Sequence, residues 1–141
     1  MDNFDPKPYC EEWINIVKEH YGKDFTYKKE DIEELDEILE RFHEEYERSG
    51  LSDTAMSNIS VWAGCYIGQV MLETKLYESG YKWSLEENEP CLEKNDGNKC
   101  FPCTKVWKRI ANGREDSVKS FFDIGLLIAE GKIPQMKKDN G

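Results

Sequence analysis

The stretch Ile59-Ser-Val-Trp-Ala-Gly-Cys-Tyr-Ile-Gly-Gln-Val-Met-Leu72 is apolar at nearly every position. A helix that is apolar on all sides is buried on all sides. We therefore predict a central helix over residues 53–79, capped by Ser52 or Asp53 and ended by Gly80. Gly64 and Gly68 share one side of this helix, where another backbone can approach closely. Trp62 and Tyr66 are expected to be among the most buried side chains.

Hydrophobic periodicity predicts two helices before the central one and two after it. Their ranges are residues 9–21, 28–49, 105–112 and 115–130. A short strand is predicted over residues 81–85, and Asn95-Asp96-Gly97-Asn98 indicates a hairpin between residues 91–94 and 99–101. The order predicts an α+β fold, with a helical layer around a buried central helix, a small antiparallel sheet and two C-terminal helices. Its 141 residues predict a single domain with flexible ends at 1–7 and 132–141.

The overall charge restricts the kind of partner. Lys and Arg number 19 and Asp and Glu number 29, which gives a net charge of -10. This charge disfavours nucleic acid and anionic membranes and favours a basic protein partner. The start of the chain lacks a secretory signal, and no apolar run reaches the roughly 20 residues of a membrane span. We therefore expect a cytoplasmic protein whose five cysteines, an odd number, are free thiols.

The helix predicted over residues 28–49 carries most of the negative charge. Residues 30–48 contain ten acids against two bases, Arg41 and Arg48. Helical spacing places Leu35 and Leu39 on an inner face, and it predicts a stripe of outward carboxylates on the other side. This acidic stripe consists of Glu33, Glu37, Glu40 and Glu44. It is either a docking surface for a basic protein or a solvated helix face. A smaller pole of opposite charge consists of Lys105, Lys108, Arg109 and Arg114.

The cysteines Cys91, Cys100 and Cys103 are candidate metal ligands. A Cys-x-x-Cys turn such as Cys-Phe-Pro-Cys can direct two sulfurs to one zinc ion, which binds four ligands. An Asp96-Gly97 turn would place Cys91 opposite Pro102, and Cys65 or His20 could complete the site. The alternatives are a redox role or simple packing as small apolar side chains. The predicted cofactor is therefore none, with zinc as the alternative.

Catalytic signatures are absent from the sequence. It contains no glycine-rich phosphate loop, no Gly-x-Ser-x-Gly and no His-Glu-x-x-His. His43 lies among acids and is expected to be solvated, whereas His20 falls on the inner stripe of its helix and is expected in the core. Gln69 is the polar residue within the apolar stretch, so it is either hydrogen-bonded in the core or faces a pocket. These absences favour a non-enzymatic protein over an enzyme.

Two segments carry a resemblance to a known family. They are Trp62-Ala-Gly-Cys-Tyr-Ile-Gly-Gln69 and Pro102-Cys-Thr-Lys-Val-Trp-Lys-Arg-Ile-Ala-Asn-Gly113, with Trp83 between them and residues 116–123 after them. Together they resemble small uncharacterised bacterial domains with a Gly-x-Tyr-x-Gly-Glu helix and a Pro-x-x-Lys-Val-x-x-Arg-x-x-Asn-Gly segment. The chain departs from that pattern with Gln69 in place of Glu and with its cysteine-rich hairpin. The resemblance implies a shared architecture, and such small acidic proteins are often immunity or inhibitor proteins.

The leading functional hypothesis is a non-enzymatic acidic module, immunity-like or inhibitor-like, that docks a basic partner through the acidic stripe. The alternative is a zinc-stabilised or small-ligand-binding domain centred on the cysteine hairpin. A salt-sensitive complex would favour the first hypothesis, and stoichiometric metal would favour the second. Nothing in the sequence indicates the oligomeric state.

Overall fold

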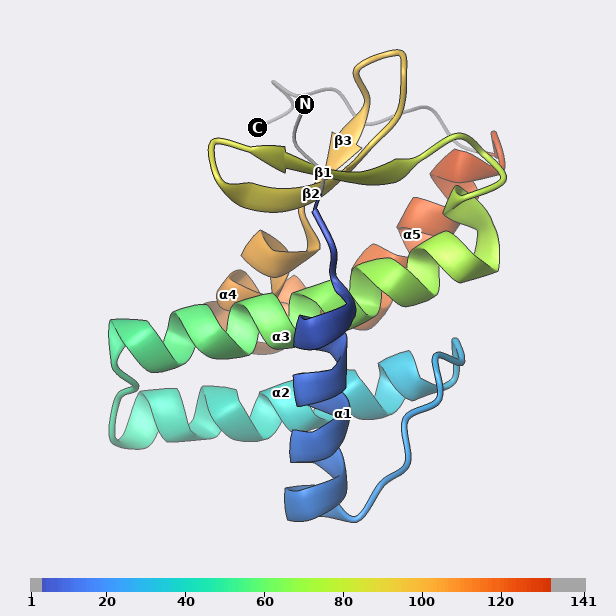
Figure 1. Cartoon of the computed structure of the whole chain (residues 1–141). Coiled ribbons are helices and arrows are strands. Elements are labelled where there is room, and N and C mark those ends of the chain that lie inside the picture. Colours follow the sequence, from blue (N-terminus) through green and yellow to red (C-terminus); the bar gives the residue numbers. More distant parts are fainter. Residues whose placement is uncertain (1–3, 133–141) are drawn as a thin grey trace.

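Helix α3 (Asp53–Met71) lies at the centre of the molecule, as its sequence predicts (Figure 1). The structure is a computed structural model that describes residues 4–132. Helices α1 (Lys7–Tyr21), α4 (Pro102–Asn112) and α5 (Val118–Ala129) pack against α3, and a hydrogen bond from Tyr66 to Asp31 joins α3 to α2 (Asp31–Arg48). With a small antiparallel sheet above the helices, the predicted α+β fold with two C-terminal helices is confirmed.

Local interactions determine where α3 begins and ends. The Ser52 hydroxyl accepts a hydrogen bond from the backbone N–H of Ala55 at 3.1 Å, which caps the first turn. At the other end the helix widens into a π-helical turn, Leu72–Leu76. Gly80, with φ +98°, then reverses the chain in a conformation that side chains rarely adopt. The single predicted helix over residues 53–79 is therefore an α-helix followed by a π turn.

Helix α2 (Asp31–Arg48) starts later than the sequence predicts, because the Asp31 side chain is already engaged in the preceding loop. Its Oδ2 accepts from the backbone N–H of Thr26 at 2.9 Å and of Lys28 at 3.1 Å. The same oxygen accepts the hydroxyl of Tyr66 at 2.6 Å. This carboxylate therefore ties the α1–α2 loop to the centre of α3.

The sheet has three antiparallel strands in the order β1-β2-β3. Its strands are β1 (Lys82–Glu86), β2 (Glu89–Glu93) and the short β3 (Lys99–Cys100). Leu92 pairs with Cys100 and Glu93 with Lys99, so Cys91 falls opposite Phe101. The predicted register, with Cys91 opposite Pro102, is wrong by one residue.

The two glycines of α3 explain how closely its neighbours pack. A Cβ on Gly64 would lie 2.5 Å from Cα of Cys103 in α4, and one on Gly68 would lie 2.5 Å from the ring of Trp83. The close approach predicted from the glycine spacing is therefore present. Pro102 takes the first turn of α4, where its missing N–H is not needed.

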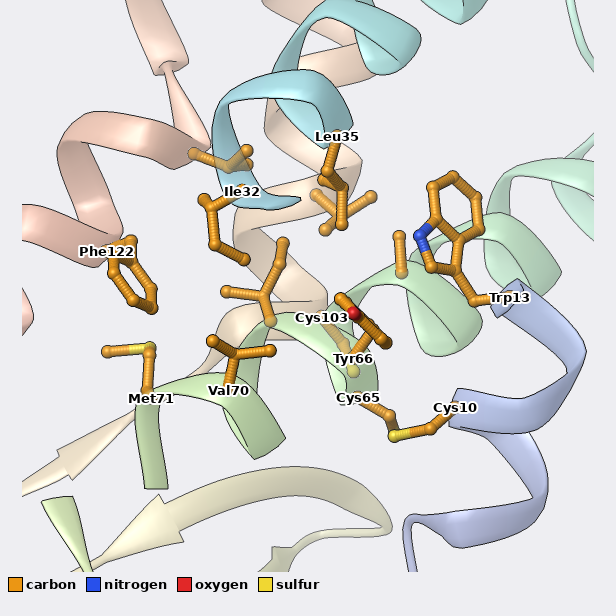
Figure 2. Close-up of a cluster of buried hydrophobic side chains, with 14 of the residues drawn as sticks. Cys10, Trp13, Ile32, Leu35, Cys65, Tyr66, Val70, Met71, Cys103 and Phe122 are labelled. Atoms are coloured by element: carbon orange, nitrogen blue, oxygen red, sulfur yellow. The ribbon is translucent and has the colours of Figure 1, made fainter. Parts of the chain in front are cut away.

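The core is centred on different aromatic residues than the sequence suggests. Tyr66 is fully buried, as predicted, and so is Trp13 of α1 (Figure 2). Trp62 is only half-buried, so the expectation that it is among the most buried side chains is wrong. Figure 1 shows that α1 leaves the first half of α3 uncovered on that side, and Trp62 lines two open hollows of the surface.

The N-terminal segment joins the fold earlier than predicted. Phe4 stacks on Tyr9 with ring centroids 5.7 Å apart and also contacts Trp83 at 5.5 Å. Within the N-terminal end predicted to be flexible, Phe4 thus packs against the molecule and Lys7 begins α1. Residues 1–3 and 133–141 lie outside the described part of the chain. Within residues 4–132, no helix is both long enough and apolar enough to span a membrane.

Candidate functional site

The acidic stripe predicted on α2 is partly consumed by contacts inside the molecule. Arg114 holds Glu37 through two hydrogen bonds, at 2.8 and 3.2 Å, and the Glu40 carboxylate accepts from Nη1 of Arg109 at 2.8 Å. Glu40 is half-buried, so the prediction that it faces outward is wrong. Glu33 and Glu44 remain exposed. Half of the predicted docking stripe is therefore paired within the molecule, Glu40 with Arg109 of α4 and Glu37 with Arg114 of the short turn that follows α4.

The predicted basic pole supplies the cations for this contact. Arg109 has no exposed surface, and its Nε donates to Asp36 at 2.7 Å while its Nη2 donates to the Asp36 backbone carbonyl at 3.1 Å. Asp36 also accepts from the Ser117 hydroxyl at 2.8 Å, at the start of α5. Burial alone would raise the pKa of Asp36, but the hydrogen bonds from Arg109 and Ser117 outweigh it and lower the pKa below its ordinary value. This network joins α2, α4 and α5.

Gln69 is a structural residue with both ends of its amide satisfied. Its Oε1 accepts from the indole Nε1 of Trp83 at 3.0 Å, and its Nε2 donates to Glu73 at 2.9 Å. The residue does not line any of the described hollows. The amide of Gln69 is thus hydrogen-bonded, but at a half-buried position and not deep in the core.

The three candidate zinc ligands lie in two different environments. Cys91 and Cys100 belong to β2 and β3, whereas Cys103 packs into the α3–α4 contact beside Gly64. Cys103 is grouped instead with Cys65 and Cys10 in the helical core (Figure 2). Among residues 4–132 no three His, Cys, Asp or Glu side chains are arranged to hold a metal ion. The zinc alternative therefore has no ligand set in the described part of the chain.

All five cysteines are free thiols, as predicted. Burial raises the pKa of Cys91 to about 11 and the pKa of Cys100 to about 12. The pKa of Cys65 is raised by its hydrogen bond with Cys103 and by burial. Because the thiolate is the reactive form, these side chains are poor nucleophiles at neutral pH.

An open, mostly apolar hollow lies where α1, α2 and α3 meet. It has a volume of about 500 Å³. Its lining residues are Trp13, Ile16, His20, Tyr21, Phe42, Ala55, Asn58, Ile59 and Trp62. His20 is exposed at its edge, so the prediction that it lies in the core is wrong. We call this the first hollow.

A second hollow, of about 320 Å³, lies between the start of α1, α3 and the β1–β2 hairpin. Its lining residues are Phe4, Tyr9, Asn58, Val61, Trp62, Leu85, Asn88 and Pro90. Asn58 and Trp62 line both hollows, so the indole of Trp62 forms the divide between them. The two hollows therefore form one track across α3.

Among the residues that flank the lining residues in the sequence, acids outnumber bases. Immediate sequence neighbours of the lining residues include the acids Asp5, Glu12, Glu19, Glu86, Glu87 and Glu89, against the single base Arg41. Glu19 lies 3.9 Å from the imidazole Nε2 of His20 and so stands at the rim of the first hollow. The guanidinium of Arg41 lies over the ring of Tyr21, 5.5 Å from its centroid. Tyr21, which lines the first hollow, thus makes a cation–π contact with a residue of the protein itself.

This track was not predicted from the sequence. Trp13, Phe42 and Trp62 each fall on an apolar helix face, and apolar spacing alone does not distinguish a core contact from the wall of a hollow. The first hollow is also separate from the acidic stripe. On α2, Phe42 lies about 200° around the helix from Glu44, so the hollow and the exposed part of the acidic stripe occupy different faces of that helix.

No family model, no curated protein and no solved structure matches this chain. The resemblance of residues 62–123 to small bacterial domains stays a prediction. The residues that carry it have structural roles here: Gly64 admits Cys103, Trp83 bonds to Gln69, and Arg109 pairs with Asp36. They therefore account for part of the architecture.

Proposed function

We propose that this protein is a non-enzymatic binding module that captures a basic segment of a protein partner in the track around Trp62. The observation that carries the proposal is the half-buried Trp62, which lines two open, mostly apolar hollows. Tryptophan is the side chain most enriched at energetic hot spots of protein interfaces. An aromatic anchor with an apolar floor gives affinity, and a polar rim gives selectivity.

The acidic surroundings of the track select the sign of the partner. Glu12 and Glu19 on α1 are exposed beside the first hollow. A negative rim attracts cationic segments and repels acidic ones, which raises the association rate with a basic partner at low salt. The same charge complementarity is consistent with an inhibitor-like role, because a module that binds a cationic surface of its partner blocks access to that surface.

The first test is selection from a random peptide library of about 16 residues per peptide displayed on phage, a length sufficient for a binding helix or strand. We expect enriched sequences that carry Lys or Arg together with large apolar residues. Their binding should weaken steeply as the salt concentration rises. Selected peptides that are acidic, or a selection that enriches nothing, would contradict the proposal.

A variant pair locates the binding site on α3. Ala55→Phe adds a large side chain inside the first hollow, whereas Thr54→Phe adds the same side chain at an exposed neighbouring position outside it. Ala55→Phe should weaken peptide binding by about tenfold or more, which is the effect of losing one hot-spot contact. Thr54→Phe should leave the affinity within about twofold of wild type. Equal affinities for both variants would place binding elsewhere.

A further inference from the structure

The arrangement of the helices assigns a shape to the partner segment. Figure 1 shows α1 alone crossing in front of α2 and α3, so the layer that α1 forms has no second helix. The track lies beside α1 and runs from the β1–β2 hairpin across α3 toward Phe42 of α2. We infer that the partner segment is a basic amphipathic helix that lies beside α1 and places one apolar anchor in each hollow. This inference rests on the proposed function and makes it specific.

The usual spacing of packed helices suits a helix beside α1. Adjacent packed helices lie roughly 8–10 Å apart, so a helix beside α1 would cover the strip of α3 that α1 leaves open. On that strip Asn58 and Trp62 are one helical turn apart, and both border the two hollows. An approaching helix must therefore straddle the Trp62 indole, with apolar side chains on either side of it. Anchors spaced along one helical face are the usual way in which a helix binds in a groove.

The charges along the track exclude a second copy of this chain as the occupant. Glu19 lies at the rim of the first hollow beside His20, and the exposed acids Glu12, Asp5 and Glu87 directly flank lining residues in the sequence. The chain itself carries a net charge of -10. A second copy would bring further negative charge to this rim, whereas Lys or Arg on the outer face of a foreign helix would meet carboxylates on both sides.

The walls of the track are better suited to binding a helix than to pairing with an added strand. β1 contributes Leu85 to the second hollow, but α1 and α3 form most of the remaining wall, and they offer side chains rather than a free sheet edge. An extended peptide needs the backbone groups of a strand along its whole length. A helix satisfies its own backbone groups and requires only side-chain contacts from the track.

The test uses the basic peptide that the library selection enriches most strongly. Val61→Phe fills the second hollow, and Ser57→Phe, one turn earlier on the exposed face of α3, is its matched control. We expect Val61→Phe and Ala55→Phe each to weaken binding by about tenfold, and Ser57→Phe to change it by less than about twofold. A proline placed in the middle of the peptide should abolish binding, because proline breaks a helix.

The outcomes separate this inference from the proposed function. If Ala55→Phe weakens binding and Val61→Phe does not, the partner uses the first hollow alone, and the two-anchor helix is wrong while the binding module stands. If the proline peptide binds as tightly as the parent peptide, the segment is not a helix, and the inference is again overturned. If neither filling variant weakens binding, both the inference and the proposed function are wrong. Thermal unfolding of each variant checks that the fold is intact.

Discussion

Arg109 donates from Nε to the carboxylate of Asp36 over 2.7 Å, at a depth where the guanidinium has no exposed surface. The two residues are 73 positions apart in the chain. Their pairing explains why a strongly acidic helix packs closely against the rest of the molecule. It also means that part of the charge of α2 serves the fold and is not free to bind a partner.

Removing the cation of this pair should be costly. Arg109→Ala leaves Asp36 with an uncompensated charge next to the core, and breaking a buried ion pair from one side typically costs about 3–5 kcal/mol. Chemical denaturation at neutral pH measures the loss. Lys108→Ala, at an exposed neighbouring position on the same helix, should change the free energy of unfolding by less than about 0.5 kcal/mol. Similar small losses in both variants would contradict the role given to Arg109.

The same pair predicts a pH dependence of stability. Because the pKa of Asp36 is lower in the folded protein than in the unfolded chain, its ionisation stabilises the fold above the ordinary aspartate pKa of 3.8. This contribution is lost as the pH falls through the lower, folded-state value. The stability gap between wild type and Asp36→Asn should therefore narrow between pH 6 and pH 3.

Denaturation curves at several pH values measure that gap. Glu33→Gln, at an exposed position with no ion pair among the described residues, is the control and should follow the wild-type pH dependence. A gap between wild type and Asp36→Asn that stays constant down to pH 3 would show that Asp36 does not contribute through its charge.

Two glycine substitutions should have opposite effects. Gly64→Ala places its Cβ 2.5 Å from the backbone Cα of Cys103, so α4 must move, and overpacking of this kind typically costs about 1–3 kcal/mol. Gly125→Ala meets only the terminal methyl of Met71, which can rotate away. Since alanine favours a helix by up to about 1 kcal/mol over glycine, Gly125→Ala should be neutral or stabilising. Thermal unfolding of the two variants compares them directly, and equal melting temperatures would be inconsistent with the α3–α4 contact described.

Two serines, Ser52 just before α3 and Ser60 within it, provide a further contrast in stability. The Ser60 hydroxyl is buried with no hydrogen-bond partner among the described residues, whereas the Ser52 hydroxyl caps the helix. Ser60→Ala removes an unsatisfied group and should leave stability unchanged or raise it by up to about 1 kcal/mol. Ser52→Ala should cost about 1 kcal/mol. Urea denaturation of both variants tests the assignment, which fails if Ser60→Ala is the more damaging change.

Local signals in the sequence predict the fold well, and the errors have physical causes. The cap at Ser52, the helix ends at Gly22 and Gly80 and the hairpin at Gly97 depend on residues close in sequence. The burial of Trp62 depends on how the other elements pack around α3, which the apolar pattern does not encode. The pattern assigns Trp62 to the core and therefore gives no sign that this residue lines the two hollows.

The partner-binding prediction failed in part for a similar reason. Helical spacing correctly places Glu33 and Glu44 on the outside, but it treats Glu40 in the same way. The position of Glu40 is determined by Arg109, which is 69 residues away and belongs to another helix. An isolated helical pattern contains no information about such a contact.

Nuclear magnetic resonance of the tryptophan indoles tests the central claim most directly. The chain has four tryptophans, and Trp→Phe variants assign the four indole N–H signals. Trp62 divides the two hollows, whereas Trp107 is exposed on α4 and lines neither of them, so it serves as an internal control. On titration with the selected basic peptide, we predict a large shift of the Trp62 signal and an unchanged Trp107 signal. A Trp62 signal that does not move while the peptide binds would contradict the account.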